Sequence, residues 1–102
     1  MTLGEVLSQA SASLPSGVDR VVSKDGAVEW KVDGLTFATL DRSGRTASFR
    51  LDTIVAGAAR LTPDTARSSF GDTWVAFSPK VLDGPAADRA QAWFLAAHRR
   101  AG

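Results

Sequence analysis

The chain has 102 residues, enough for one hydrophobic core but not for two, and its 44% hydrophobic and 23% charged residues are typical of a globular domain. Twelve basic against eleven acidic side chains give a net charge of +1, which excludes nucleic-acid binding by bulk charge alone. The lack of cysteine excludes disulfides, thiolate metal ligands and thiol catalysis, and a single histidine excludes a site built from several histidines. Apolar runs are too short for a membrane span and the N-terminus has no signal-peptide pattern, so we expect one cytoplasmic domain over residues 1–102.

The N-terminal segment predicts an amphipathic helix. Thr2 and Glu5 have the spacing of a capping box, in which each side chain accepts a hydrogen bond from the other's backbone N–H. Apolar residues then recur at helical spacing as far as Leu14, and Pro15 ends the pattern.

Residues 18–51 predict a four-stranded antiparallel meander. The dipeptides Asp25-Gly26 and Asp33-Gly34 each separate runs in which apolar and polar residues alternate, the pattern of a two-residue hairpin turn. Two-residue turns at both places would put Val21 opposite Trp30 and Trp30 opposite Phe37.

The third turn of the meander, around Gly44, is predicted from the register of the apolar residues. A three-residue loop puts Phe49 opposite Phe37 and places Gly44 in the left-handed conformation that such loops require. The predicted core face of the meander then consists of eight residues: Val21, Val28, Trp30, Val32, Leu35, Phe37, Phe49 and Leu51.

The second half of the chain predicts further helices and one more strand. We expect a short helix over 52–59, a helical turn beginning at Thr62-Pro63-Asp64, a fifth strand over 72–78 and a last helix from Asp83 to about Arg100. The predicted fold is therefore α+β with two layers: an antiparallel sheet, made of the four-strand meander plus a fifth strand, with the N- and C-terminal helices packed on one face.

The chain also resembles a known family, the MmcQ/YjbR-like proteins. The residues that carry the likeness are 12–19 (ASLPSGVD), 29–38 (EWKVDGLTFA), 49–52 (FRLD), 71–75 (GDTWV) and 93–100. The resemblance implies a compact α/β fold similar to secretion-chaperone-like domains, and some members carry a DNA-binding label. It defines no catalytic residue, and the lysine that the family has after the hairpin glycine is Leu35 here.

The register that builds the core face also predicts a basic row on the opposite face. Arg20 would lie opposite Lys31, Lys31 opposite Thr36, and Thr36 opposite Arg50. Like charges in one row of a sheet are mildly destabilising, so either an anionic partner neutralises them or the side chains spread into solvent. Trp74 either packs in the core or forms a stacking platform for a base beside this row.

No pattern in the sequence indicates an active site. Most carboxylates stand at expected turns and helix caps, and no phosphate loop, nucleophile elbow or metal triad is present, so we expect no enzyme, no metal and no cofactor. The basic end of the last helix, His98-Arg99-Arg100, complements the helix dipole. We expect a non-catalytic binding or interaction module for a protein partner or a second copy. The alternatives are weak DNA binding through the basic row and a small-ligand pocket between sheet and helix.

Overall fold

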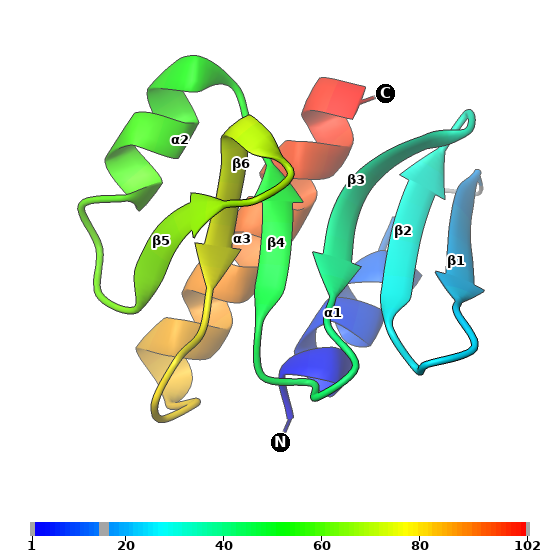
Figure 1. Cartoon of the computed structure of the whole chain (residues 1–102), viewed down its shortest axis with the longest axis horizontal. Helices are drawn as coiled ribbons and strands as arrows, with labels where there is room; N and C mark the ends of the chain where they lie inside the picture. Colours follow the sequence, from blue (N-terminus) through cyan, green and yellow to red (C-terminus); the bar gives the residue numbers. More distant parts are fainter. Residues whose placement is uncertain (1, 15–16, 102) are drawn as a thin grey trace.

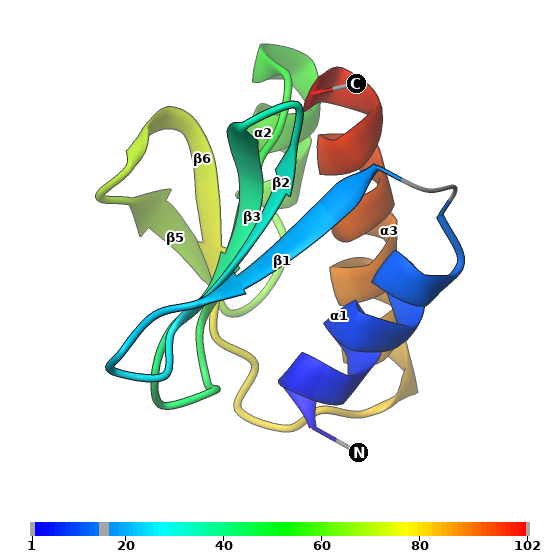
Figure 2. The same ribbon diagram turned by 90° about the vertical axis from the view of Figure 1, so that its right-hand side faces the viewer.

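The computed structural model describes residues 2–14 and 17–101. It contains three helices and six strands in the order α1 (Leu3–Ala12), β1 (Val18–Val22), β2 (Val28–Val32), β3 (Leu35–Leu40), β4 (Ala47–Arg50), α2 (Thr53–Ala59), β5 (Thr65–Ser68), β6 (Gly71–Phe77) and α3 (Gly84–Ala101). The strands form one antiparallel sheet in the order β1-β2-β3-β4-β6-β5 (Figure 1). Helices α1 and α3 pack together against one face of it (Figure 2). The predicted α+β sheet with terminal helices is confirmed, and the sheet has one strand more than predicted.

Both terminal helices begin where the sequence indicates. Thr2 and Glu5 form the expected capping box, with Thr2 N donating to Glu5 Oε1 at 2.9 Å and Glu5 N donating to Thr2 Oγ1 at 3.2 Å. Asp83 Oδ1 accepts the backbone N–H of Ala86 at 2.9 Å at the start of α3. Over the described residues, 2–14 and 17–101, none of the helices has both the length and the apolar character that crossing a membrane would need.

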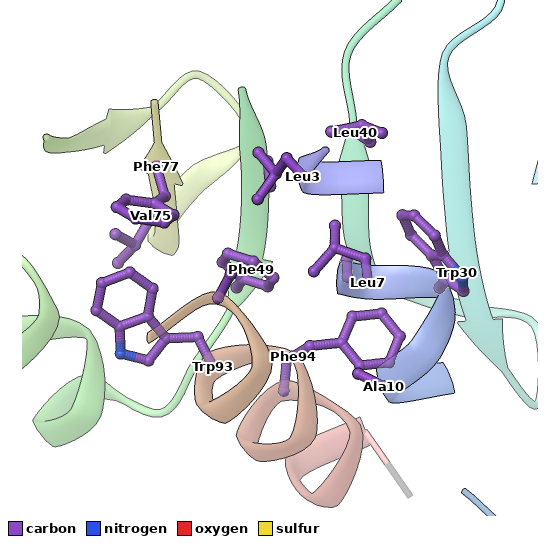
Figure 3. Close-up of a cluster of buried hydrophobic side chains, with 14 of the residues drawn as sticks. Leu3, Leu7, Ala10, Trp30, Leu40, Phe49, Val75, Phe77, Trp93 and Phe94 are labelled. Atoms are coloured by element: carbon purple, nitrogen blue, oxygen red, sulfur yellow. The ribbon is translucent and has the colours of Figure 1, made fainter. Parts of the chain in front are cut away.

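The core lies between the sheet and the helices α1 and α3. Its largest fully buried side chains are aromatic, and they meet edge to face: Trp30 and Phe94 have ring centroids 5.5 Å apart, and Phe77 and Trp93 are 5.1 Å apart. Figure 3 shows α1 contributing aliphatic side chains to the same cluster. The layer between sheet and helices is therefore a packed core.

The first turn of the meander differs from the prediction. Ser23 N donates to Ala27 O at 2.8 Å, so the loop has three residues, Lys24 to Gly26, with Gly26 at φ 96°. The reason is local, because Asp25 accepts hydrogen bonds from the hydroxyl of Ser23 and from Ala27 N, the latter at 3.0 Å. One residue more in the loop moves every residue of β1 to the other face.

The second turn of the meander is the predicted two-residue turn. Asp33 and Gly34 have φ values of 51° and 80°, and Val32 pairs with Leu35. A β-bulge follows in β3, opposite Trp30 and Lys31 of β2. Trp30 therefore pairs with Ala38 instead of Phe37. Phe37 is the extra residue, and both it and Ala38 are fully buried.

The third loop of the meander is also longer than predicted, by one residue. This extra residue compensates for the extra residue of the bulge, so the residues of β4 keep their predicted faces. Asp41 N donates to Thr46 O at 2.9 Å, which leaves four loop residues instead of three. The carboxylate of Asp41 holds this loop by accepting the N–H groups of Arg45 and Thr46, each at 3.1 Å. Phe49 consequently pairs with Ala38, yet it shares the core face with Phe37 as predicted. Gly44 has the predicted positive φ, at 74°.

The segment after α2 contains the strand that the sequence did not predict. The expected helical turn at Thr62-Pro63-Asp64 is wrong, because Asp64 adopts φ 65° and directs the chain into β5. Thr65 pairs with Phe77, and Ser78 N donates to Asp64 O at 2.9 Å. Strands β5 and β6 therefore form a hairpin at the end of the sheet opposite β1.

Candidate functional site on the open face of the sheet

The open face of the sheet is the face turned away from α1 and α3. Side chains alternate along a strand, so the neighbours of the buried core residues point to this face. One row of paired residues crosses it: Glu29, Thr39, Ser48 and Ala76. The β5–β6 hairpin and the loop between β1 and β2 both project on this side (Figure 2). The open face is therefore bordered at both ends.

A groove of about 650 Å³ lies on the open face between these borders. That row of four residues is its floor, and three loops are its walls. The lining residues outside the floor are Ser23, Asp25, Ala27, Val28, Leu40, Asp41, Arg42, Thr46, Arg67, Ser68, Ser69 and Phe70. We call this cavity the open-face groove.

Hydroxyl groups line much of the open-face groove. Ser48 is 5% exposed, although it lies on the face that the helices leave uncovered. The cover comes from the β5–β6 hairpin, where Ser68 Oγ donates to Ser48 Oγ at 3.5 Å. Where the loop between β3 and β4 borders the groove, Thr46 Oγ1 lies 2.7 Å from Oγ of Ser78, the residue after β6. These groups both donate and accept hydrogen bonds, so the groove suits a polar ligand.

Three carboxylates lie on the β1–β3 side of the groove. The pKa of Asp25 is held below its usual value, mainly by the hydrogen bond from the Ser23 hydroxyl and then by that from Ala27 N. Burial acts to raise the pKa of Asp41, but the hydrogen bonds from Thr46, Ser43 and Arg45 outweigh it and lower the pKa. Both groups are therefore anionic near neutral pH. Glu29 lies half-buried on the floor, and Thr36 Oγ1 donates to its Oε1 at 3.5 Å.

Two arginines complete the charges of the groove. Arg67 borders the groove on the β5 side, and Arg42 stands in the loop between β3 and β4, where its charge helps to lower the pKa of Asp25. The three acids therefore lie on the β1–β3 side together with Arg42, and the groove is charged unevenly.

The predicted basic row is only partly present. Arg20 pairs with Trp30, which puts it on the helix-facing side of the sheet, and Asp19 takes its place opposite Lys31. The inclusion of Arg20 was wrong because the first loop is one residue longer than predicted. Lys31 pairs with Thr36 as predicted. Arg50 also lies on the open face, but its paired neighbour is Trp74.

Trp74 lies on the open face beside the groove, half-buried. Its ring centroid is 5.2 Å from that of Phe70, which is 59% exposed at the tip of the β5–β6 hairpin. Trp30 and Trp93, by contrast, are in the core, at 1% and 8% exposure. Arg50, Trp74 and Phe70 thus form a second cluster, which we call the aromatic rim.

The basic end of the last helix lies on the helix side of the sheet. His98 lies in the last turn of α3 with two arginines, as predicted, and its ring packs 5.5 Å from that of Phe37, away from the groove. Within residues 2–14 and 17–101 no three His, Asp or Glu side chains gather where a metal ion could bind.

The sequence reasoning missed the residues that the β5–β6 hairpin brings to the groove. Arg67, Ser68 and Phe70 belong to a segment with little apolar character, so its strand was not recognised. One signal was available: Phe70-Gly71 precedes the predicted fifth strand, and Gly71 has φ 146°, a conformation that favours glycine.

Comparison with known proteins adds no relative, since no family model matches the chain and no curated protein matches it.

Proposed function

We propose that this chain is a non-catalytic binding module that holds an extended peptide segment in the open-face groove. The observation that carries the proposal is the groove itself, whose floor is polar, partly covered by a hairpin and charged unevenly. An ordinary solvent-facing sheet surface would leave Ser48 exposed, whereas here it is 5% exposed.

The width of the floor supports an extended ligand. Neighbouring strands lie about 4.8 Å apart, so the floor from Glu29 on β2 to Ala76 on β6 spans about 14 Å. A fully extended chain covers that distance in four to five residues at about 3.3 Å each. The hydroxyls of Thr39 on the floor and Ser69 on the hairpin can donate to and accept from the N–H and C=O groups of such a segment.

The charges support a ligand with a basic side chain near one end. Asp25, Glu29 and Asp41 would attract that side chain. The exposed ring of Phe70 offers an apolar contact beside them.

The chemistry of the same groups supports binding over catalysis. Asp25 and Asp41 are bonded to their own loops, and the hydroxyls of Ser48 and Ser68 are bonded to each other. A nucleophilic hydroxyl needs a neighbouring base that takes its proton, and His98 lies on the other side of the sheet.

The proposal is tested by calorimetric titration of two capped hexapeptides, one alternating lysine with threonine and one alternating glutamate with threonine. We expect the lysine peptide to bind more tightly. Glu29→Gln should weaken its binding about tenfold or more, since a hydrogen bond to a charged group contributes about 1.5–3 kcal/mol. Asp88→Asn, on exposed α3, makes the same change in net charge and should leave affinity unchanged. Equal affinities for the two peptides would contradict the proposal.

A second candidate function is weak binding of single-stranded nucleic acid at the aromatic rim. The observation that favours it is the pairing of Arg50 with Trp74, beside the exposed ring of Phe70. A guanidinium next to half-exposed aromatic rings can hold a phosphate while a base stacks. Since Arg20 lies on the other face, only Lys31 and Arg50 of the predicted row would contribute.

We also propose that the chain is a distant member of the MmcQ/YjbR-like family. The support is that the most family-like residues, 29–38, form one structural unit, the β2–β3 hairpin. The DNA-binding label of some family members agrees with the second candidate. An experimental structure of a family member with a strand order other than β1-β2-β3-β4-β6-β5 would contradict this membership.

A further inference from the structure

Apart from Thr53 at its first position, helix α2 consists of apolar residues and glycine. No ionisable residue occurs between Asp52 and Arg60, the two residues that flank it. Its inner side is buried through Ala56 and Ala59, as expected for a helix that packs on a sheet. Figure 1 shows α2 at the β5–β6 end of the molecule, far from β1.

The outer side of α2 is exposed and equally apolar. Ile54 is 85% exposed and Leu61 is 88% exposed. The helical path continues as far as Leu61, because Leu61 N donates to Ala58 O at 3.1 Å. Ile54, Ala58 and Leu61 are spaced i, i+4 and i+7, so they lie in one stripe with Gly57 beside them. We call these four residues the α2 stripe.

An apolar stripe of this kind is unusual on a surface helix. A surface helix usually carries polar residues on its outer side, and a helix that is apolar all round is usually buried. The guanidinium of Arg60 does not shield the stripe, since it bonds to the carbonyl oxygen of Asp72 at the start of β6. The α2 stripe is therefore an unpartnered apolar surface of the kind that contacts between molecules cover.

We propose that the covering molecule is a second copy of this chain, with the two α2 helices antiparallel. The α2 stripe is complementary to itself, because it has large side chains at both ends and Gly57 and Ala58 in the middle. A two-fold axis between Gly57 and Ala58 sets Ile54 of each copy against Leu61 of the other. The small central residues let the helices approach closely, and the stripe brings no like charges together.

The expected dimer is weak. Helix α2 has seven residues and is therefore about 10 Å long. A contact of that length buries less than the ~1,200 Å² of a stable complex, so we expect a dissociation constant above the ~1 µM that marks the weak end of full-size interfaces. This dimer is independent of the open-face groove, which lies on other residues.

The first test is sedimentation equilibrium of the full chain from about 10 µM to about 1 mM, a range around the expected dissociation constant. Ile54→Asp should raise that constant at least tenfold. Val81→Asp places the same charge on another exposed apolar residue, at 70% exposure, and should leave it unchanged. Circular dichroism of both variants shows whether they are folded. A chain that stays monomeric over the whole range would overturn the proposal.

The second test leaves the two large side chains of the α2 stripe, Ile54 and Leu61, unchanged. The chain lacks cysteine, so Ala58→Cys supplies one thiol beside the proposed axis. Ala92→Cys supplies one on the exposed side of α3. A short bifunctional maleimide should give covalent dimers of the Ala58→Cys variant at least fivefold faster than of the Ala92→Cys variant. Equal rates would exclude the second copy and leave a different protein as the covering molecule.

Discussion

Ser68 Oγ on β5 donates a hydrogen bond to Ser48 Oγ on β4 at 3.5 Å, although β6 lies between these two strands. The contact shows that the sheet curves strongly at this end, so that β5 covers part of the open face. That curvature turns a flat polar surface into the open-face groove. The groove therefore depends on the β5–β6 hairpin as much as on the residues of its floor.

The first prediction concerns the core. Trp30 is 1% exposed and packs edge to face on Phe94, so Trp30→Ala should lower the free energy of unfolding by about 3–5 kcal/mol. Trp30→Phe should cost about 1–2 kcal/mol, because it keeps an aromatic ring and the buried Nε1 it removes has no hydrogen-bond partner. Urea denaturation measures both. An unchanged midpoint for Trp30→Ala would contradict the position of the core.

The second prediction compares two glycines that have no neighbour within 4 Å of an added Cβ atom. Gly44 has φ 74°, so Gly44→Val should destabilise the protein by about 1–2 kcal/mol through backbone strain alone. Gly57 lies inside α2 with ordinary helical φ, and Gly57→Ala should stabilise by about 0.5–1 kcal/mol. Thermal unfolding of the two variants should shift the midpoint in opposite directions, and a shift in the same direction would be evidence against the loop geometry.

The third prediction is acid sensitivity. The folded chain lowers the pKa values of Glu5, Asp25 and Asp41, chiefly through hydrogen bonds to the carboxylates. The unfolded chain then binds protons more readily, so the free energy of unfolding falls as pH drops below the unfolded values of about 4. Asp41→Asn should make this fall shallower between about pH 4 and pH 2, since it removes one of the three groups. A slope identical to that of the parent chain would count against the Asp41 loop.

The turns show how much of the fold could be predicted from the sequence. The same dipeptide, Asp-Gly, forms a two-residue turn at Asp33 but a three-residue loop at Asp25. The difference comes from Ser23, whose hydroxyl binds the carboxylate of Asp25, and this contact exists only after the loop has closed. The helix caps were predictable because each depends on residues three apart, as in Thr2 and Glu5.

The site was less predictable than the fold because it depends on long-range pairing. Alternation along β3 changes phase at Phe37 and Ala38, two adjacent apolar residues that the bulge buries together, whereas the prediction assumed an unbroken register through this strand. Strand β5 has little apolar character and is defined by its pairing with β6. Arg67 and Ser68 therefore could not be assigned to a site from the sequence, whereas the open-face positions of Lys31 and Arg50 could.

The fourth prediction separates the two faces of the sheet in nucleic-acid binding. If the aromatic rim binds single-stranded DNA, two phosphate contacts give a log–log salt slope of about −1.4. Arg50→Ala should make that slope shallower by about 0.7, and Arg20→Ala, on the opposite face, should not change it. Fluorescence anisotropy at several salt concentrations measures the slope, and an equal effect of the two variants would remove the rim as the binding site.

The most direct test of the open-face groove is a nitrogen-15 heteronuclear NMR titration of the chain with the capped lysine–threonine hexapeptide. Binding in the groove predicts that the largest shift changes fall on the amides of Glu29, Thr39, Ser48 and Ala76 and on the β5–β6 hairpin. The exposed residues of α1 and α3 should change little. Shift changes confined to α1 and α3, or spread evenly over the surface, would contradict the groove as the binding site.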